Sequence, residues 1–430
     1  MHAGSAHCRE SWPRKHDSVI GKRGSTGSHY TVRMLTSPPL ALYIHIPWCV
    51  KKCPYCDFNS HALVGGIPQE AYVAALLADL DRDLADFGEA LAGRALHSIF
   101  FGGGTPSLFS AESIARILAG VGERLPFDPR IEITLETNPG TVEHGRFDGY
   151  LAAGVNRISF GVQSFDDAAL RRLGRIHSAS DAARVIGEAR AAGFDNCNID
   201  LMYALPGQDL VAAARDVEQA IALAPTHVSH YQLTIEPNTE FAARPPTLPD
   251  SDAAWDMQEH CQQLLADAGY AQYEISAYAQ VGRRSRHNLN YWQFGDYLGI
   301  GAGAHGKVTH AATGIIRRRA KQRTPRAYLQ HAGQARGIAS EATLASIDLP
   351  FEYMMNALRL VDGVPMREFA QRTGLGIEAI ADTLAVARAQ GWIDNEPELL
   401  RTTESGQRFL NDVIALFLPA VAGESGRRHA

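Results

Sequence analysis

The stretch HIPWCVKKCPYCDFNSH, residues 45–61, places three of the six cysteines of this 430-residue chain within eight positions. The other three lie far from it in the sequence: Cys8, Cys197 and Cys261. Lysine, proline and asparagine residues around the thiols give the segment the composition of a loop rather than of a hydrophobic core. Six cysteines are too few for a disulfide framework in a chain of this length, so a local group of thiols indicates a metal site.

The spacing of Cys49, Cys53 and Cys56 is compatible with two kinds of metal site. A structural zinc ion would need a fourth ligand, such as His45 or His61. A 4Fe–4S cluster bound by only three thiolates would keep one iron open for another ligand. A reactive metal centre needs such an open position, just as catalytic zinc does. The pattern therefore favours an iron–sulfur cluster held by the three cysteines.

Segments with the two-residue period of strands alternate with helical segments on both sides of this loop. The expected strands are 41–48, 95–101, 130–136, 155–162, 196–203 and 227–235. The expected helices are 69–91, 110–125 with Ser110 as its N-cap, 141–153, more than one helix across 166–193, and 209–224. Strands and helices that alternate in this way predict an α/β fold with six parallel βα units, over residues 39–245.

Polar residues and glycines fall at the ends of these expected strands. The cysteine loop follows the first strand and the segment GGGTPS follows the second. Glu136, Gln163 and Asp200 lie at or near the ends of the next three, and Thr234 and Glu236 close the sixth. Because the carboxyl ends of parallel strands meet at one edge of a sheet, we expect these residues to converge on one site.

The remainder of the chain divides into further segments. Residues 246–344 are expected to extend the sheet domain, with an irregular stretch at 270–306. Three helices and a short hairpin over 345–420 predict a winged-helix-like α+β domain. Residues 1–38 are expected to be a disordered extension or an over-long start preceding Met34, and 421–430 a tail.

Composition excludes several classes of function. The net charge is −6 and arginines are scattered over the winged-helix-like segment, which argues against nucleic-acid binding. No apolar run reaches the roughly 18 residues of a membrane span, so at most a peripheral membrane contact is expected. The sequence lacks the apolar core of a secretory signal, and we expect a cytoplasmic protein.

The cysteine loop and FGGGTPS, residues 101–107, together resemble the radical S-adenosylmethionine (SAM) superfamily. This resemblance implies a partial (β/α)6 barrel, in which the open iron of a 4Fe–4S cluster binds the amino and carboxylate groups of SAM. An electron from the cluster, which requires an electron donor, then cleaves SAM to a 5′-deoxyadenosyl radical.

Further motifs narrow the resemblance over about residues 39–420. LYIHIPWC, ETNPG, RISFGVQSF, NIDLMYALPGQ and HYQLTIEPNT are similar to oxygen-independent coproporphyrinogen III oxidases and to a related branch, the HemW-type heme chaperones. The resemblance implies cluster ligands at Cys49, Cys53 and Cys56. It also implies SAM contacts at Tyr43, Gly103, Gly104, Thr105, Glu136, Gln163, Arg175 and Asp200.

Two features favour the chaperone branch over the oxidase. The oxidase usually has a cysteine two residues after the third ligand, where this chain has Phe58. RHNLNYW, residues 286–292, is similar to the HNxxYW element of the heme-handling branch, which implies heme contacts at His287, Tyr291 and Trp292. The alternative for this segment is a loop whose aromatic residues pack on the barrel.

The resemblance thus implies heme as cargo and an apo-haemoprotein acceptor such as a respiratory cytochrome. The alternative function is the radical oxidative decarboxylation of coproporphyrinogen III to protoporphyrinogen IX. Residues 317–326, RRRAKQRTPR, are either a solvated basic face or a partner for heme propionates. No catalytic side chain is identified from the sequence.

Overall fold

The computed structural model describes residues 35–141 and 146–419 of the chain. Residues 1–34 of the expected N-terminal extension and the tail over 421–430 lie outside the described residues. Residues 35–38 do not fit a disordered extension, because Leu35 is buried and the Thr36 N–H donates to the Gln371 carbonyl at 3.0 Å. The helix expected over 141–153 is described only as α3 (Arg146–Ala152), because 142–145 also lie outside them.

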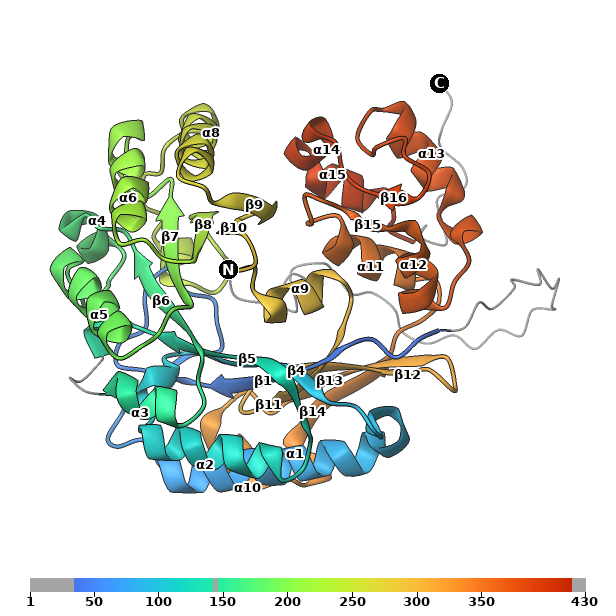
Figure 1. Cartoon of the computed structure of the whole chain (residues 1–430), viewed down its shortest axis with the longest axis horizontal. Helices are drawn as coiled ribbons and strands as arrows, with labels where there is room; N and C mark the ends of the chain where they lie inside the picture. The colour runs from blue at the N-terminus through green and yellow to red at the C-terminus, as the bar shows by residue number, and fades with distance from the viewer. Residues whose placement is uncertain (1–34, 142–145, 420–430) are drawn as a thin grey trace.

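A twelve-stranded sheet dominates the structure, and the six predicted strands lie side by side at its centre (Figure 1). All five pairings between them are parallel. The strands are β1 (Leu40–Ile46), β4 (Leu96–Gly103), β5 (Phe127–Thr137), β6 (Arg157–Gln163), β7 (Cys197–Tyr203) and β8 (His227–Gln232). The α/β class and the six parallel βα units are therefore confirmed.

Helices connect the parallel strands and cover one face of the sheet. They are α1 (Gln69–Leu91), α2 (Ala111–Gly122), α3, α4 (Asp167–Arg172), α5 (Ala179–Ala191), α6 (Leu210–Ala222), the short α7 (Glu240–Ala243) and α8 (Ser251–Asp267). Ser110 caps α2 as predicted, because its side chain accepts a hydrogen bond from the Ser113 N–H. Apolar faces of these helices and strands form one large core, which fixes the positions of the strand ends.

Both edges of the sheet are extended by residues 271–343. β11 (Asp296–Ile300) adds a seventh parallel strand beside β1, followed by antiparallel β12 (His305–His310), β13 (Ile315–Lys321) and β14 (Ile338–Thr343). β10 (Ala277–Ala279) and β9 (Ala271–Glu274) extend the other edge next to β8. The expectation of an irregular stretch at 270–306 was wrong. Strands of three to five residues buried on both faces, such as β11, show no alternation to detect.

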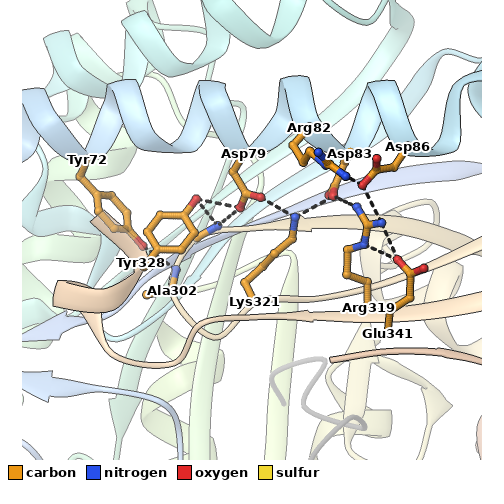
Figure 2. Close-up of polar contacts among 11 residues, drawn as sticks. Tyr72, Asp79, Arg82, Asp83, Asp86, Ala302, Arg319, Lys321, Tyr328 and Glu341 are labelled. Atoms are coloured by element: carbon orange, nitrogen blue, oxygen red, sulfur yellow. Dashed lines mark hydrogen bonds and ion pairs between the residues drawn. The ribbon is translucent and has the colours of Figure 1, made fainter. Parts of the chain in front are cut away.

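A buried ion-pair network joins β13 to α1 (Figure 2). Lys321 forms ion pairs with Asp79 and Asp83, and the Arg319 guanidinium lies 2.7 Å from Asp83 and also pairs with Glu341. Arg318 pairs with the buried Glu352 in the C-terminal domain at 2.6 Å. The run at 317–326 therefore contributes its central cations to internal pairs, and the hypothesis that these cations bind heme propionates is not supported.

The C-terminal residues form a separate small helical domain, drawn in orange and red in Figure 1. It contains α11 (Leu349–Ala357), α12 (Met366–Thr373), α13 (Ala381–Ala389), α14 (Glu404–Arg408) and α15 (Leu410–Ala415), with β15 (Val364–Pro365) paired to β16 (Leu399–Leu400). α11, α12 and α13 are the three helices expected for a winged-helix-like domain, and α14 and α15 follow them. The paired strands lie before α12 and after α13, so this pair is not the expected short hairpin. The hydrophobic core of this domain includes residues of α9 (Arg286–Trp292), which also contacts β1 and β4, so α9 fixes the domain against the sheet. The helix α10 (Pro325–His331) packs instead against α1, on the barrel side.

Candidate cluster and cofactor site

A cavity of about 800 Å³ opens at the carboxyl ends of the parallel strands and extends to the C-terminal domain. It brings together most of the residues that the sequence predicted. The predicted residues on its lining are Cys49, Cys53, Cys56, Gly103, Gly104, Thr105, Glu136, Gln163, Arg175, Asp200, Thr234, Glu236 and Trp292. All of these except Trp292 come from the rim of the barrel, as expected for the ends of parallel strands.

The cysteine loop is held in place at both ends. At its start, β2 (Trp48–Cys49) pairs with β3 (His61–Ala62). Near its end, the Asn59 side chain donates to the carbonyls of Ala302 and Arg323, at 2.9 and 2.8 Å. Nε2 of His45 donates to the Asn59 carbonyl at 2.9 Å. The loop therefore rests on the extension of the sheet as well as on β1, and its three thiols have a defined position.

The glycine loop after β4 packs directly against the chain that leads into Cys49. The N–H groups of Gly104 and Thr105 donate to the carbonyls of Ile46 and Trp48, both at 2.8 Å. A Cβ on Gly104 would lie 2.5 Å from the Trp48 carbonyl oxygen, and Gly103 has a φ of +114°. Only glycine fits this close backbone approach, which brings the loop beside the thiols.

Burial affects the chemistry of the thiols. It raises the pKa of Cys49 and raises that of Cys56 to about 11, so both would be protonated at neutral pH without a metal. The Arg175 guanidinium donates to the Cys53 sulfur at 3.7 Å, and Ser60 Oγ lies 3.9 Å from the Cys56 sulfur. Metal coordination deprotonates thiols, and a nearby cation stabilises the resulting negative charge. The donor set thus fits a thiolate-bound metal cluster.

The arrangement fits a cluster better than a single zinc ion. Among the described residues, no three His, Cys, Asp or Glu side chains are close enough together to hold one metal ion. Both nitrogens of His45 are already engaged, with the Tyr43 hydroxyl and the Asn59 carbonyl. An iron–sulfur cubane spreads its thiolate ligands over separate irons and does not require the sulfurs to converge on one point.

The other predicted SAM contacts lie on the same cavity, with one exception. Glu136 accepts from the Gly103 N–H at 3.3 Å, and Asp200 accepts from Ser159 and Asn198 at 3.1 and 2.8 Å. The exception is Tyr43, whose hydroxyl contacts His45 and which does not line the cavity. In this structure Tyr43 supports the histidine that anchors the cysteine loop.

Gln163 combines a functional position with an unusual backbone. It ends β6 with a φ of +74°, a region that residues other than glycine rarely adopt. Its Oε1 accepts a hydrogen bond from the Tyr231 hydroxyl at 2.7 Å, and the side chain lines the cavity. Backbone strain of this kind concentrates at binding sites, which supports a binding role for Gln163.

The three residues of the predicted heme contact are not brought together on the cavity. Only Trp292 lines it. His287 is fully buried on α9, where its Nδ1 lies 3.0 Å from Ser98 Oγ and its ring stacks on Phe100. Tyr291 is also buried and packs against His287 and Tyr297. In this conformation His287 cannot reach a heme iron, so its assignment as the axial ligand is not supported.

The sequence analysis missed the far side of the cavity. Trp255 on α8, His230 on β8 and Arg359 beyond α11 line it, as do residues of α14 and α15. Arg359 lies over the Trp292 ring at 4.3 Å, and Arg408 over the Trp255 ring at 4.9 Å. Trp255, Arg359 and the residues of α14 and α15 lie outside the motifs of the barrel rim. His230 is the exception, because it lies in the HYQLTI segment, which could have suggested it.

Three thiols, a glycine loop and acidic residues at the rim of parallel strands define the site of a radical SAM protein. Residues 43–220 match the Radical SAM superfamily, and residues 344–409 match the HemN C-terminal domain. The solved structure of coproporphyrinogen III oxidase (HemN) from Escherichia coli shares the fold, with a TM-score of 0.75 over 90% of this chain and 91% of that one, at 22% identity.

Sequence comparison places the chain more narrowly. It is 53% identical over 381 residues to a protein named heme chaperone HemW from Haemophilus influenzae, with 89% of this chain and 98% of that one covered. It is 52% identical over 385 residues to the protein of the same name from Escherichia coli, with 90% of this chain and 100% of that one covered. The chain therefore belongs to the HemW family of radical SAM proteins.

Proposed function

We propose that the chain is a heme chaperone that carries a 4Fe–4S cluster and SAM and passes heme to apo-haemoproteins such as a respiratory cytochrome. One observation carries this proposal: 52–53% identity, almost from end to end, to proteins named heme chaperone HemW. Among the described residues, no helix has both the length and the apolar content that a membrane crossing requires.

The residues of the cavity supply what the two cofactors need. Cys49, Cys53 and Cys56 would hold the cluster, and the glycine loop with Glu136 and Asp200 would hold SAM. When bound and supplied with an electron, the cluster and SAM are a source of a 5′-deoxyadenosyl radical. Arg175 would neutralise thiolate charge at Cys53, and the half-buried Phe58 of the cysteine loop lines the cavity.

Phe58 supports the chaperone over the oxidase. It lines the cavity at the position where the oxidase usually has a further cysteine. A phenyl ring cannot ligate a metal, donate a proton or carry a hydrogen atom to or from a substrate, whereas a thiol can do all three. Phe58 therefore leaves the site without the thiol that is usual in the oxidase branch of the superfamily.

The test is one anaerobic preparation with a reconstituted cluster. Ferric heme should give a stable Soret band, and mixing with an apo-cytochrome should move that band to the cytochrome at a rate above that of free heme. A wild-type protein that forms no stable heme complex would refute the proposal.

A second assay on the same preparation tests the alternative function, the oxidative decarboxylation of coproporphyrinogen III. With SAM and a reductant, coproporphyrinogen III is expected to remain unconverted. Formation of protoporphyrinogen IX would instead show that this chain catalyses the decarboxylation. Phe58→Cys is the matched variant, because it restores the thiol and tests whether that single side chain limits the reaction.

A further inference from the structure

His230 lies on the cavity and is not explained by the cluster or by SAM. It belongs to β8, where its N–H donates to the Ser276 carbonyl at 2.8 Å and fixes the backbone. The side chain is only 3% exposed, lines the cavity, and stacks on Tyr203 with 4.7 Å between ring centroids. None of the described residues forms a hydrogen bond with either ring nitrogen, and Nδ1 is buried. His230 is the only histidine on the described lining of the cavity.

A buried imidazole without hydrogen bonds is unusual, because a buried polar group that lacks a partner costs free energy. The structural histidines of this barrel show the contrast. His227 bonds Asn198 and Tyr273 through its two nitrogens, and His177 bonds the Val162 carbonyl. An imidazole that faces a cavity without such partners is suited to bind a ligand that enters the cavity.

The protonation state of His230 suits a metal ligand. Burial lowers the pKa of His230 to about 3, so the imidazole is neutral at physiological pH and offers a lone pair. The neighbouring phenols are less suited, since burial raises the pKa of Tyr203 and Tyr231. Their hydroxyls already donate to Gln258 and Gln163, at 2.9 and 2.7 Å. Among nearby groups, the imidazole is the better iron ligand.

The surrounding side chains suit a flat aromatic macrocycle. Trp255 and Trp292 line the same cavity as His230, and each carries a guanidinium over its ring, from Arg408 and Arg359. Indole rings provide flat apolar contacts for such a macrocycle. Both guanidiniums are already in ion pairs, Arg359 with the buried Glu274 at 3.1 Å and Arg408 with Glu404 at 2.6 Å, so the fit depends on the indole rings.

We propose that His230 is an axial ligand of the heme iron, with the porphyrin lying between α8 and the C-terminal domain; this assignment rests on the proposed function. The bond forms when the lone pair of the neutral imidazole displaces a water molecule from the iron. No proton or electron is exchanged in this step. The cargo then shares one cavity with the cluster and SAM, on the side opposite the cysteine loop.

The test uses the full chain with its cluster reconstituted and ferric heme as the probe. His230→Ala is expected to lose the resonance Raman and EPR signature of an imidazole–iron bond and to bind heme about tenfold or more weakly. Added imidazole should restore the signature in His230→Ala, which a purely structural loss would not allow. His287→Ala, the matched control, should keep both the signature and the affinity. Unchanged spectra in His230→Ala, or loss of the signature in His287→Ala, would overturn the assignment.

Two further measurements distinguish loss of the iron ligand from misfolding, and failure of the His230 assignment from failure of the proposed function. Iron content and SAM binding report whether each variant is folded. Histidine labelled with ¹⁵N in the wild-type protein and in His287→Ala tests for an imidazole ligand without altering His230; a shift in the iron–ligand vibration is expected in both. A wild-type protein without stable heme would refute the proposed function and the ligand together. Stable heme without the ¹⁵N shift would refute only the ligand.

Discussion

Lys321 offers a sharp test of how the sheet extension supports the site. Its side chain is 1% exposed, and its ammonium group lies between the carboxylates of Asp79 and Asp83 on α1 (Figure 2). Lys321→Met removes the charge and keeps a chain of similar length. Breaking a buried pair from one side typically costs ~3–5 kcal/mol, because it leaves a buried charge without compensation. We expect about 3 kcal/mol, the lower end of that range, because Asp79 also accepts from the Tyr328 hydroxyl at 2.8 Å and Asp83 keeps Arg319.

Thermal unfolding of the anaerobic protein followed by circular dichroism measures this loss. A deficit of this size should lower Tm by roughly 3 °C, because a chain of 430 residues has an unfolding entropy of about 0.9 kcal/mol/K. Arg326→Met, an exposed cation from the same basic run, is the control and should change stability by less than ~0.5 kcal/mol. Adding Asp79→Asn to Lys321→Met should recover much of the loss, because the buried charge is then removed from both sides. Equal losses in Lys321→Met and Arg326→Met, or a double variant no better than the single one, would refute the reasoning.

The stability lost in Lys321→Met should depend on pH, and the pKa of Asp79 sets the direction of that dependence. Burial raises the pKa of Asp79, and Lys321 opposes this shift. A carboxyl with a higher pKa in the folded than in the unfolded state holds more protons when folded, so its contribution to stability falls as the pH rises. Removing Lys321 raises the pKa further. The deficit relative to wild type should therefore be largest at neutral pH and shrink as the pH falls toward the ordinary carboxyl value of about 3.9.

Three further outcomes are expected. Cys53→Ser should lose the cluster iron measured after anaerobic reconstitution, whereas Cys261→Ser, a buried thiol on α8 away from the cavity, should retain it. Gln163→Gly should be more stable than Gln163→Ala by ~1 kcal/mol in urea unfolding, because only glycine relieves the positive φ; both should bind SAM more weakly. The low pKa of His230 means that the unfolded state takes up its proton first as the pH falls below 6.5. Wild type should therefore lose up to ~1.4 kcal/mol of stability per pH unit through this group, relative to His230→Gln.

The barrel was predictable because its evidence is local. Six buried strands are each followed by a helix with its own periodicity, and α1 begins at Gln69 and ends at Leu91 as predicted. The cysteine and glycine loops are each encoded by a few adjacent residues. By contrast, β11 pairs with β1 across more than 250 residues of sequence, and both faces of β11 are buried. Such a strand leaves no amphipathic pattern, so the seventh parallel strand appears only in the structure.

The half of the site that the sequence did not predict depends on contacts between distant segments. His287 and Tyr43 both belong to family motifs. In the fold, however, the His287 ring stacks on Phe100 and the Tyr43 hydroxyl contacts His45. His230 opens the HYQLTIEPNT motif, which does not by itself single out the imidazole, yet the fold leaves that imidazole without a partner on the cavity. A motif specifies residue types that a family retains, whereas access to a ligand depends on which neighbours cover each side chain. For the heme ligand of this chain, the buried imidazole on the cavity is therefore stronger physical evidence than the sequence motif on α9.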